Sequence, residues 1–354
     1  MKIGIITQPL GRNYGGMLQN WALQQVLKDM GHDPVTIDPG EPYSRGQWCY
    51  RTLKTMVKKA LGLRCYWPMM PQHGRHGNPL TAPFIHKNII MTRPQAGYHE
   101  DVIDNYGLEA LVVGSDQVWR LKYNAATWQD QFLQFARGRD VRRVAYAASF
   151  GVDEWEYTSE QTALCAELLQ RFDAVSVREN SAVQLCEQHY GVTPELVVDP
   201  TLLITSDRYA ALCDDVPRAT GDFIAVYCLD GTDATKAKID KIAAALQLPV
   251  RAFSAHSSIS LTVEQWLAMF RDSRAVITDS FHGTVFSAIF KKQAYIIPNL
   301  TRGGTRFHTL MALMGLSAAS MSDEGILHLD PTEINETLSN EIAKSKRFLA
   351  ASLG

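Results

Sequence analysis

The chain has 354 residues, with 35 Lys and Arg against 37 Asp and Glu and a formal net charge of −2 at pH 7. At roughly 150 residues per domain, this length favours two domains, and an apolar content of 46% is enough for two buried cores. The balance of charges argues against a protein that binds nucleic acid through its net charge. Any anionic ligand must therefore be bound by local positive groups.

The cysteines show neither a CxxC pair nor the spacing of metal ligands, a pattern typical of reduced cytosolic thiols. They are Cys49, Cys65, Cys165, Cys186, Cys213 and Cys228. His73 and His76 in HGRHG have no third ligand at a useful spacing, which favours a solvated loop over a metal site. The start MKIGIITQPL lacks the pattern of a secretory signal, and no apolar run approaches the roughly 18 residues of a membrane span. We expect a cytoplasmic protein without a metal or a cofactor.

The first 38 residues predict a β-α-β unit. A β-branched run over 2–7 is followed by the loop QPLGRNYGG and by the helical pattern MLQNWALQQVLKDM, which ends at Gly31, a residue suited to a left-handed C-cap. The strand PVTID completes the unit.

Residues 40–107 form an irregular insert with one clear helical pattern, YRTLKTMVKKALG, over 50–62. Its apolar positions share one face of the helix, and its basic positions lie largely opposite. The apolar set is Leu53, Met56, Val57, Ala60 and Leu61, and the basic set is Arg51, Lys54, Lys58 and Lys59. The pattern is compatible with peripheral contact at the inner face of a membrane and also with an ordinary solvated helix.

Strand and helix patterns alternate in the rest of the chain, which indicates a doubly wound parallel α/β fold. The strands ALVV, RRVAYAAS, AVSV and ELVV belong to a first Rossmann-like domain over 1–205, which ends at a polar break. A second Rossmann-like domain spans 221–330, with the strands DFIAVY, PVRAFS, AVITD and AYIIP. Residues 331–354 predict a helix that could pack back on the first domain.

In open α/β sheets, ligands bind beyond the carboxyl ends of the strands. After AVITD the chain runs through Ser280, Phe281, His282 and Gly283 into a helix whose first turn can bind phosphate or carboxylate. On the residues alone, Ser280 could equally be a helix cap and His282 a structural residue. Arg302 and Arg306 lie on a glycine-bearing loop in the same half and could clamp a small dianion.

Several segments together resemble the polysaccharide pyruvyl transferase family. They are NYGGMLQNWALQQVL, VVGSDQVW, VAYAASFG, SVREN, VVDPTLL, TDSFHGTVFSAIF and the region NLTRGGTRFHTLMALMGL, all in the family's order. The resemblance implies two Rossmann-like domains facing a cleft, similar to the B-type glycosyltransferases. It also implies phosphoenolpyruvate as donor substrate, with no cofactor. The acceptor would be a hexose of a surface polysaccharide or its lipid-linked precursor, and the product a cyclic pyruvate ketal with release of phosphate.

The family's histidine falls on His282, and Arg178 in SVREN matches a position that we assign to the donor's negative groups. Where the family motif often has an arginine, two places before the histidine, this chain has Ser280. One positive charge near the donor is therefore unaccounted for, and Arg302 or Arg306 could supply it. With these we group Ser280, Phe281 and Gly283 as donor-binding residues.

Ketal formation requires protonation of the donor's methylene carbon, for which His282 is the candidate acid, although it could instead hold the phosphate. Asp116 in GSDQVW could accept a hydroxyl proton or cap the following turn. For the acceptor we predict Asn13, Tyr14, Gly15 and Trp119, because aromatic surfaces pack against sugar rings. Two rival functions remain on the same fold, a nucleotide-sugar-dependent glycosyltransferase and a non-catalytic glycan or lipid-phosphate binding protein.

Overall fold

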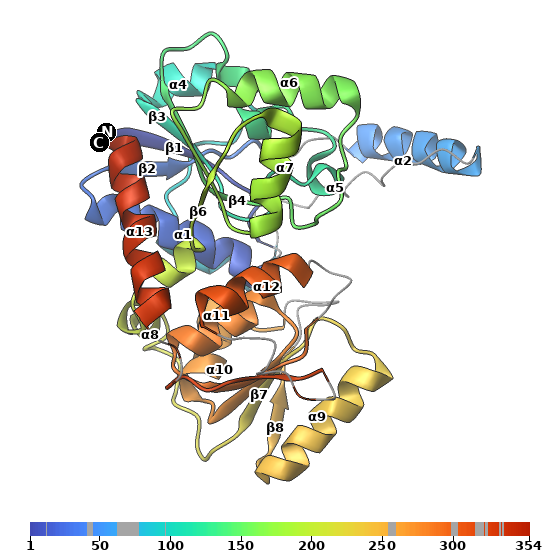
Figure 1. Cartoon of the computed structure of the whole chain (residues 1–354), viewed down its shortest axis with the longest axis vertical. Helices are drawn as coiled ribbons and strands as arrows, with labels where there is room; N and C mark the ends of the chain where they lie inside the picture. The colour runs from blue at the N-terminus through green and yellow to red at the C-terminus, as the bar shows by residue number, and fades with distance from the viewer. Residues whose placement is uncertain are drawn as a thin grey trace.

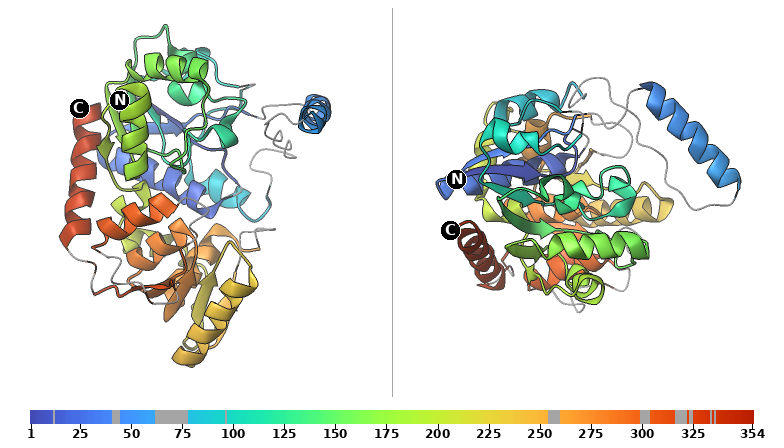
Figure 2. Two further views of the ribbon diagram at one scale, coloured as in Figure 1. Left: turned by 45° about the vertical axis from the view of Figure 1, so that its right-hand side comes forward. Right: turned by 90° about the horizontal axis from the view of Figure 1, so that it is seen from above.

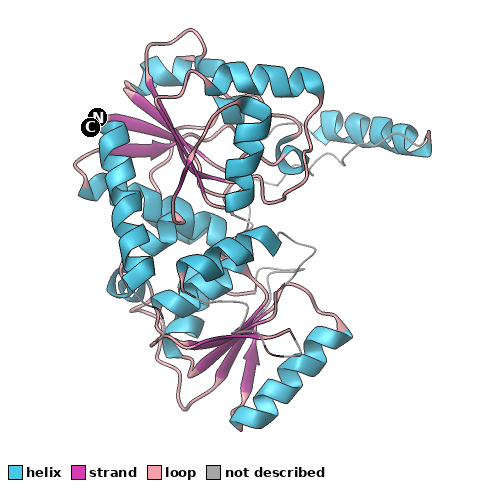
Figure 3. Ribbon diagram, viewed as in Figure 1, coloured by secondary structure: helices cyan, strands magenta, loops and turns pink. Residues whose placement is uncertain are grey.

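The computed structural model describes residues 1–11, 13–40, 45–61, 78–95, 97–253, 260–298, 304–315, 322, 325–332, 334 and 336–354. Two α/β domains follow one another along the long axis of the molecule (Figure 1). Figure 3 shows that each domain has its own sheet, with helices on both faces. The predicted pair of Rossmann-like domains is confirmed.

The N-terminal domain holds a six-stranded parallel sheet in the order β2-β1-β3-β4-β5-β6. Its strands are β1 (Lys2–Ile6), β2 (Asp33–Thr36), β3 (Ala110–Val113), β4 (Arg142–Ala148), β5 (Ala174–Val177) and β6 (Glu195–Leu196). All four residues of β3 are buried, as expected of a parallel strand covered on both faces. Helix α1 (Tyr14–Asp29) connects β1 to β2, and the register of Lys2 opposite Asp33 gives the predicted β-α-β unit.

Other helices and turns surround this sheet. They are α3 (Ala82–Asn88), α4 (Asp101–Tyr106), α5 (Leu121–Asn124), α6 (Ser159–Leu169), α7 (Asn180–Tyr190) and the 3-10 turns η1 (Asp130–Phe132), η2 (Gln134–Ala136) and η3 (Pro200–Leu203). Helix α8 (Ser206–Leu212) packs instead against α10 (Val263–Asp272) of the C-terminal domain. Helix α2 (Arg45–Ala60) begins before the helical segment that the sequence predicts, and it stands away from the domain body (Figure 2).

The C-terminal domain has a five-stranded sheet in the order β11-β10-β9-β7-β8. The strands are β7 (Ile224–Tyr227), β8 (Val250–Ala252), β9 (Ala275–Thr278), β10 (Gln293–Ile296) and the antiparallel β11 (Leu327–Leu329). Its helices are α9 (Asp233–Leu246), α10 (Val263–Asp272), α11 (Phe281–Ile289) and α12 (Gly304–Leu313).

The last helix, α13 (Glu336–Leu353), lies against the N-terminal domain, so both chain ends are close together (Figure 1). The Ser345 hydroxyl accepts a hydrogen bond of 3.0 Å from the amide of Val198, and Arg142 Nη1 donates to the carbonyl of Ser352 at 3.0 Å. These bonds join the end of the chain to the sheet of the N-terminal domain. None of the described helices is long and apolar enough to cross a membrane.

Candidate active site at the domain junction

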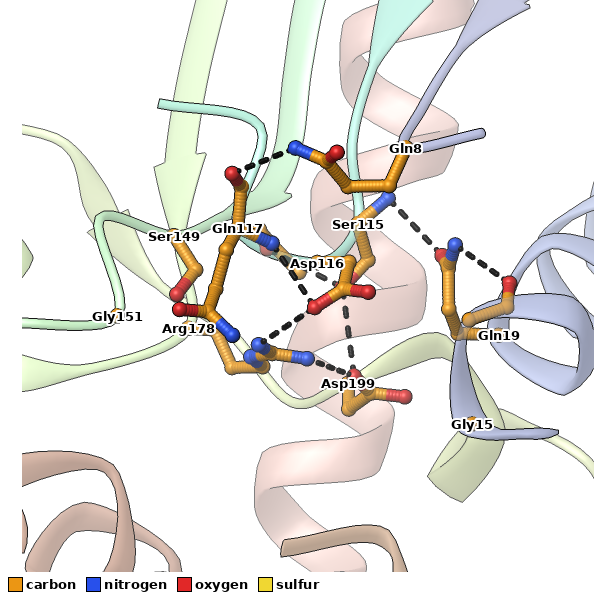
Figure 4. Close-up of polar contacts among 12 residues, drawn as sticks. Gln8, Gly15, Gln19, Ser115, Asp116, Gln117, Ser149, Gly151, Arg178 and Asp199 are labelled. Atoms are coloured by element: carbon orange, nitrogen blue, oxygen red, sulfur yellow. Dashed lines mark hydrogen bonds and ion pairs between the residues drawn. The ribbon is translucent and has the colours of Figure 1, made fainter. Parts of the chain in front are cut away.

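Polar side chains gather beyond the carboxyl ends of β3, β5 and β6, where the N-terminal domain meets the first turn of α11. Asp116 follows β3, Arg178 follows β5 and Asp199 follows β6. Figure 4 shows these three side chains converging. Because the carboxyl ends of parallel strands meet at one edge of a sheet, this is the position that the fold offers for a ligand.

Arg178 lies at the centre of this group, and its side chain is only 2% exposed. Its Nη1 donates to Asp199 Oδ2 at 2.6 Å, Nη2 is 3.5 Å from Asp116 Oδ1 and Nε is 3.9 Å from Glu179 Oε2. Its guanidinium carbon is 4.6 Å from the centre of the Phe281 ring, which is a cation–π distance. Within the described residues, Nε and Nη2 have no hydrogen-bond partner. Arg178 therefore neutralises a cluster of carboxylates and keeps two donor atoms unused.

Asp199 is fully buried and accepts several hydrogen bonds. Oδ1 accepts from the amide and hydroxyl of Thr201 at 3.0 and 2.6 Å, and Oδ2 accepts from the Ser115 hydroxyl at 3.3 Å. Burial would raise the pKa of this carboxyl, but the imidazole of His282, the charge of Arg178 and the bonds from Thr201 hold it well below its usual range. Asp199 is thus ionised at neutral pH.

His282 is in the first turn of α11 and points at Asp199 from the other domain. Its Nε2 lies 3.8 Å from Asp199 Oδ2, an ion-pair distance that is too long for a hydrogen bond. On its other side the ring lies against Gly15, since a Cβ placed on that glycine would be 2.0 Å from Nδ1. The imidazole therefore fills the space between a carboxylate and the backbone of α1.

Two helix N-termini meet at this imidazole. Asn13 caps α1 by accepting from the amide of Gly15 at 3.0 Å, and Ser280 caps α11 by accepting from the amide of Gly283 at 3.4 Å. The positive ends of the two helix dipoles therefore lie close to each other, which favours an anionic ligand. The side chains of Asn13 and Ser280 thus serve as caps in this structure.

Asp116 has a backbone φ of +77°, in the left-handed region that few residues other than glycine adopt. Its Oδ1 accepts from the amide of Gln117 at 2.9 Å and also faces Arg178. Such backbone strain is common at functional sites, where the surrounding structure holds it. The turn role of Asp116 is therefore observed, and proton acceptance by its carboxylate stays a prediction.

Gly283 has a packing role. A Cβ at this position would be 2.1 Å from Thr278 Oγ1, so the glycine allows α11 to start close to the end of β9. Its assignment to the donor site stays a prediction. Arg302 lies outside the described residues, and Arg306 lies in α12 with a side chain that is not described, so neither can be placed at the site.

Two predicted acceptor residues are buried instead of facing a cleft. Trp119 is fully buried, stacks on Phe132 with ring centres 5.2 Å apart, and donates from Nε1 to the carbonyl of Gln131. Tyr14 is 2% exposed, stacks on Trp266 and donates to the carbonyl of Leu261 at 2.7 Å. The prediction that these rings pack on a sugar is corrected, since core and interdomain contacts cover their faces.

Asp199 and Glu179 were missed as candidate site residues. Glu179 is fully buried, and its Oε1 accepts from the Ser149 hydroxyl at 2.7 Å and from the amides of Phe150 and Gly151. Their place in the sequence could have identified them, because each of these two acids follows a short strand, as Asp116 does. Among the described residues no cluster of His, Cys, Asp and Glu could hold a metal ion.

The fold is the two-domain Rossmann-like α/β fold of the B-type glycosyltransferases. The UDP-GlcNAc 2-epimerase from Neisseria meningitidis, in a structure bound to UDP-GlcNAc, is similar at a TM-score of 0.52 and 10% identity, covering 100% of this chain and 99% of that one. The S. aureus MnaA–UDP co-structure has a TM-score of 0.49 and 12% identity, covering 98% and 89%. The spinosyn rhamnosyltransferase SpnG has a TM-score of 0.36 and 13% identity, covering 99% and 96%.

The sequence model of the polysaccharide pyruvyl transferase family matches residues 13–301. The chain belongs to this family. No curated protein matches it in sequence. The matched segment contains Asp116, Arg178, Asp199 and His282, so the polar junction described above lies within the part that defines the family.

Proposed function

We propose that this polysaccharide pyruvyl transferase takes its pyruvyl group from phosphoenolpyruvate and forms a cyclic ketal on two hydroxyls of a hexose. Inorganic phosphate is released. The acceptor is a sugar of a surface polysaccharide or of its lipid-linked precursor. The observation that carries this proposal is the position of His282, between the ionised Asp199 and the N-terminus of α1.

Phosphoenolpyruvate is a small, multiply charged anion, and the junction suits such a ligand. The N-termini of α1 and α11 supply partial positive charge, and a protonated His282 adds a full one. Arg178 is already paired with carboxylates, and within the described residues its buried Nε and Nη2 have no hydrogen-bond partner. The donor would therefore be held mainly by backbone amides and His282, with Arg178 keeping the carboxylates in position.

The reaction begins with a proton transfer to the methylene carbon of the donor. His282 as an imidazolium gives this proton, the C=C bond becomes a methyl group, and the adjacent carbon becomes an oxocarbenium-like centre. Asp199 Oδ2, 3.8 Å from His282 Nε2, can hold the imidazole in position. One sugar hydroxyl then adds to the cationic carbon and loses its proton.

The second half of the reaction breaks the bond between carbon and phosphate oxygen. Phosphate leaves with its electron pair, and the second hydroxyl adds to the same carbon and loses its proton. Of the two hydroxyl protons released, one restores the histidine acid and one accompanies the phosphate. Asp116, beside Arg178 at the same edge, is the carboxylate that we assign to proton acceptance from a hydroxyl.

The proposal is tested by calorimetry and by product analysis. We expect the purified protein to bind phosphoenolpyruvate and, with a panel of lipid-linked and nucleotide-linked hexoses, to yield a product heavier by one ketal-linked pyruvate. Tight binding of a nucleoside diphosphate, with no binding of phosphoenolpyruvate, would instead indicate a nucleotide-sugar-dependent transferase. Donor binding without turnover on any acceptor would indicate a binding protein.

A further inference from the structure

Helix α2 exposes a row of large apolar side chains. The exposed fractions are 67% for Tyr50, 62% for Leu53, 52% for Met56, 54% for Val57 and 71% for Leu61. At 100° per residue these positions fall within one arc of the helix and its following residue. A continuous apolar strip of this kind marks an interaction surface more often than isolated exposed residues do.

The opposite face of α2 is the more covered one. Thr55 is 9% exposed, and Trp48 and Thr52 are half-buried. A surface helix of a globular protein normally turns its apolar face to the core and its polar face to water. In α2 the apolar strip is exposed instead, and within the described residues it has no partner.

The charge of α2 shows which kind of partner fits. The helix RGQWCYRTLKTMVKKA has basic residues and no acidic residue, in a chain whose net charge is −2. Lys54 and Lys58 are exposed and border the apolar strip. A basic border on an apolar strip is the arrangement that binds an anionic lipid surface, where lysines meet headgroups and apolar side chains enter the boundary with the acyl chains.

We propose that α2 docks this protein on an anionic membrane surface, with the helix lying in the plane of the headgroups. A second copy fits less well, because two α2 helices placed face to face would bring their basic residues together. Figure 2 shows α2 well outside the two domain bodies. The proposal does not depend on the pyruvyl transfer reaction.

Vesicle sedimentation of the full chain tests the docking. We expect binding to vesicles of phosphatidylcholine with about a quarter phosphatidylglycerol, and little binding to phosphatidylcholine alone. Lys54→Glu with Lys58→Glu should lower the partition coefficient at least about tenfold, because each basic residue contributes to attraction by anionic lipid. Leu53→Ser with Val57→Ser should lower it similarly by removing apolar area.

Lys236→Glu with Lys346→Glu is the matched control, since it makes the same charge change on exposed positions of α9 and α13. It should leave vesicle binding within about twofold, and thermal unfolding should show that all variants fold. The proposal is overturned by equal binding to neutral and anionic vesicles, by no binding at all, or by loss in the control as large as in the α2 variants. A lipid-free dimer that Leu53→Ser with Val57→Ser dissociates, without vesicle binding, would also overturn it and identify a second copy as the partner.

Discussion

The imidazole of His282 lies against the backbone of Gly15, a residue of the other domain. A Cβ on Gly15 would be 2.0 Å from His282 Nδ1, a distance that no pair of atoms can keep without movement. The imidazole can therefore occupy this place only because residue 15 has no side chain. This contact sets the position of the histidine relative to Asp199.

Gly15→Ala should displace His282 and lower the turnover number at least about tenfold, with a stability cost of about 1–3 kcal/mol from overpacking. Gly16→Ala is the control in the same helical turn, because its Cβ would be 3.5 Å from the nearest atom, Asp116 Oδ2. It should leave turnover within about twofold and raise stability slightly, since alanine is the better helix former. Steady-state kinetics of both variants checks this, and equal activities would show that the contact does not position the histidine.

Asp199 should make the stability of the protein depend on pH in acid. Its pKa is lower in the folded chain than the roughly 3.9 of an unfolded aspartate, so its stabilising contribution is complete above about pH 4 and is lost as the pH falls below that value. Asp199→Asn removes one partner of a buried pair and should cost about 3–5 kcal/mol at pH 7.

Urea unfolding of the two proteins between pH 3 and pH 7 measures this effect. The difference in unfolding free energy between the original protein and Asp199→Asn should shrink below about pH 4, where the folded carboxylate takes up a proton less readily than the unfolded one. A difference that stays constant down to pH 3 would mean that the contacts of Asp199 in the folded chain do not lower its pKa.

The order of strands and helices could be predicted because the apolar runs and the helical periods are local patterns. The rule that ligands bind beyond the carboxyl ends of strands pointed to the loops that hold His282, Asp116 and Arg178, and the family resemblance then singled out His282 and Arg178. Trp119 was assigned wrongly because an aromatic residue next to a glycine-rich turn has the same sequence pattern whether it faces solvent or, as here, packs on Phe132. Only the tertiary contacts distinguish the two cases.

The pairing around Arg178 also could not be predicted. Asp199 and Arg178 are 21 residues apart, and Asp116 is further away along the chain. No local pattern says that three strand ends place their charges within a few ångströms of one another. Similarly, the contact between Gly15 and His282 depends on the approach of two domains, which a linear pattern does not encode.

Asp116→Asn should lower turnover on phosphoenolpyruvate and acceptor by about 10²-fold or more if this carboxylate accepts a hydroxyl proton. Asparagine tolerates the left-handed φ of +77° at this position, so the backbone is retained while the charge is removed. Phosphate release with saturating donor and acceptor measures the effect. A loss of turnover of less than threefold, with the same unfolding midpoint, would mean that Asp116 only stabilises the turn.

Trp119→Phe should lower the free energy of unfolding by about 1–3 kcal/mol, because it leaves a cavity and removes the donor to the Gln131 carbonyl. The KM for the acceptor should stay unchanged in the folded fraction, since the ring is buried. Parallel denaturation and acceptor titration test this expectation. A raised KM for the acceptor with unchanged stability would mean that Trp119 contacts the acceptor after all.

The most direct measurement of the central claim is phosphate release from phosphoenolpyruvate by the protein and by His282→Gln, with and without acceptor. Glutamine keeps a polar group of similar length near Asp199 but cannot act as an acid. We predict acceptor-dependent release that falls by about 10²–10⁴-fold in His282→Gln, with an unchanged thermal midpoint. Near-normal release by the variant, with the same donor affinity, would contradict the claim that His282 carries the chemistry of this site.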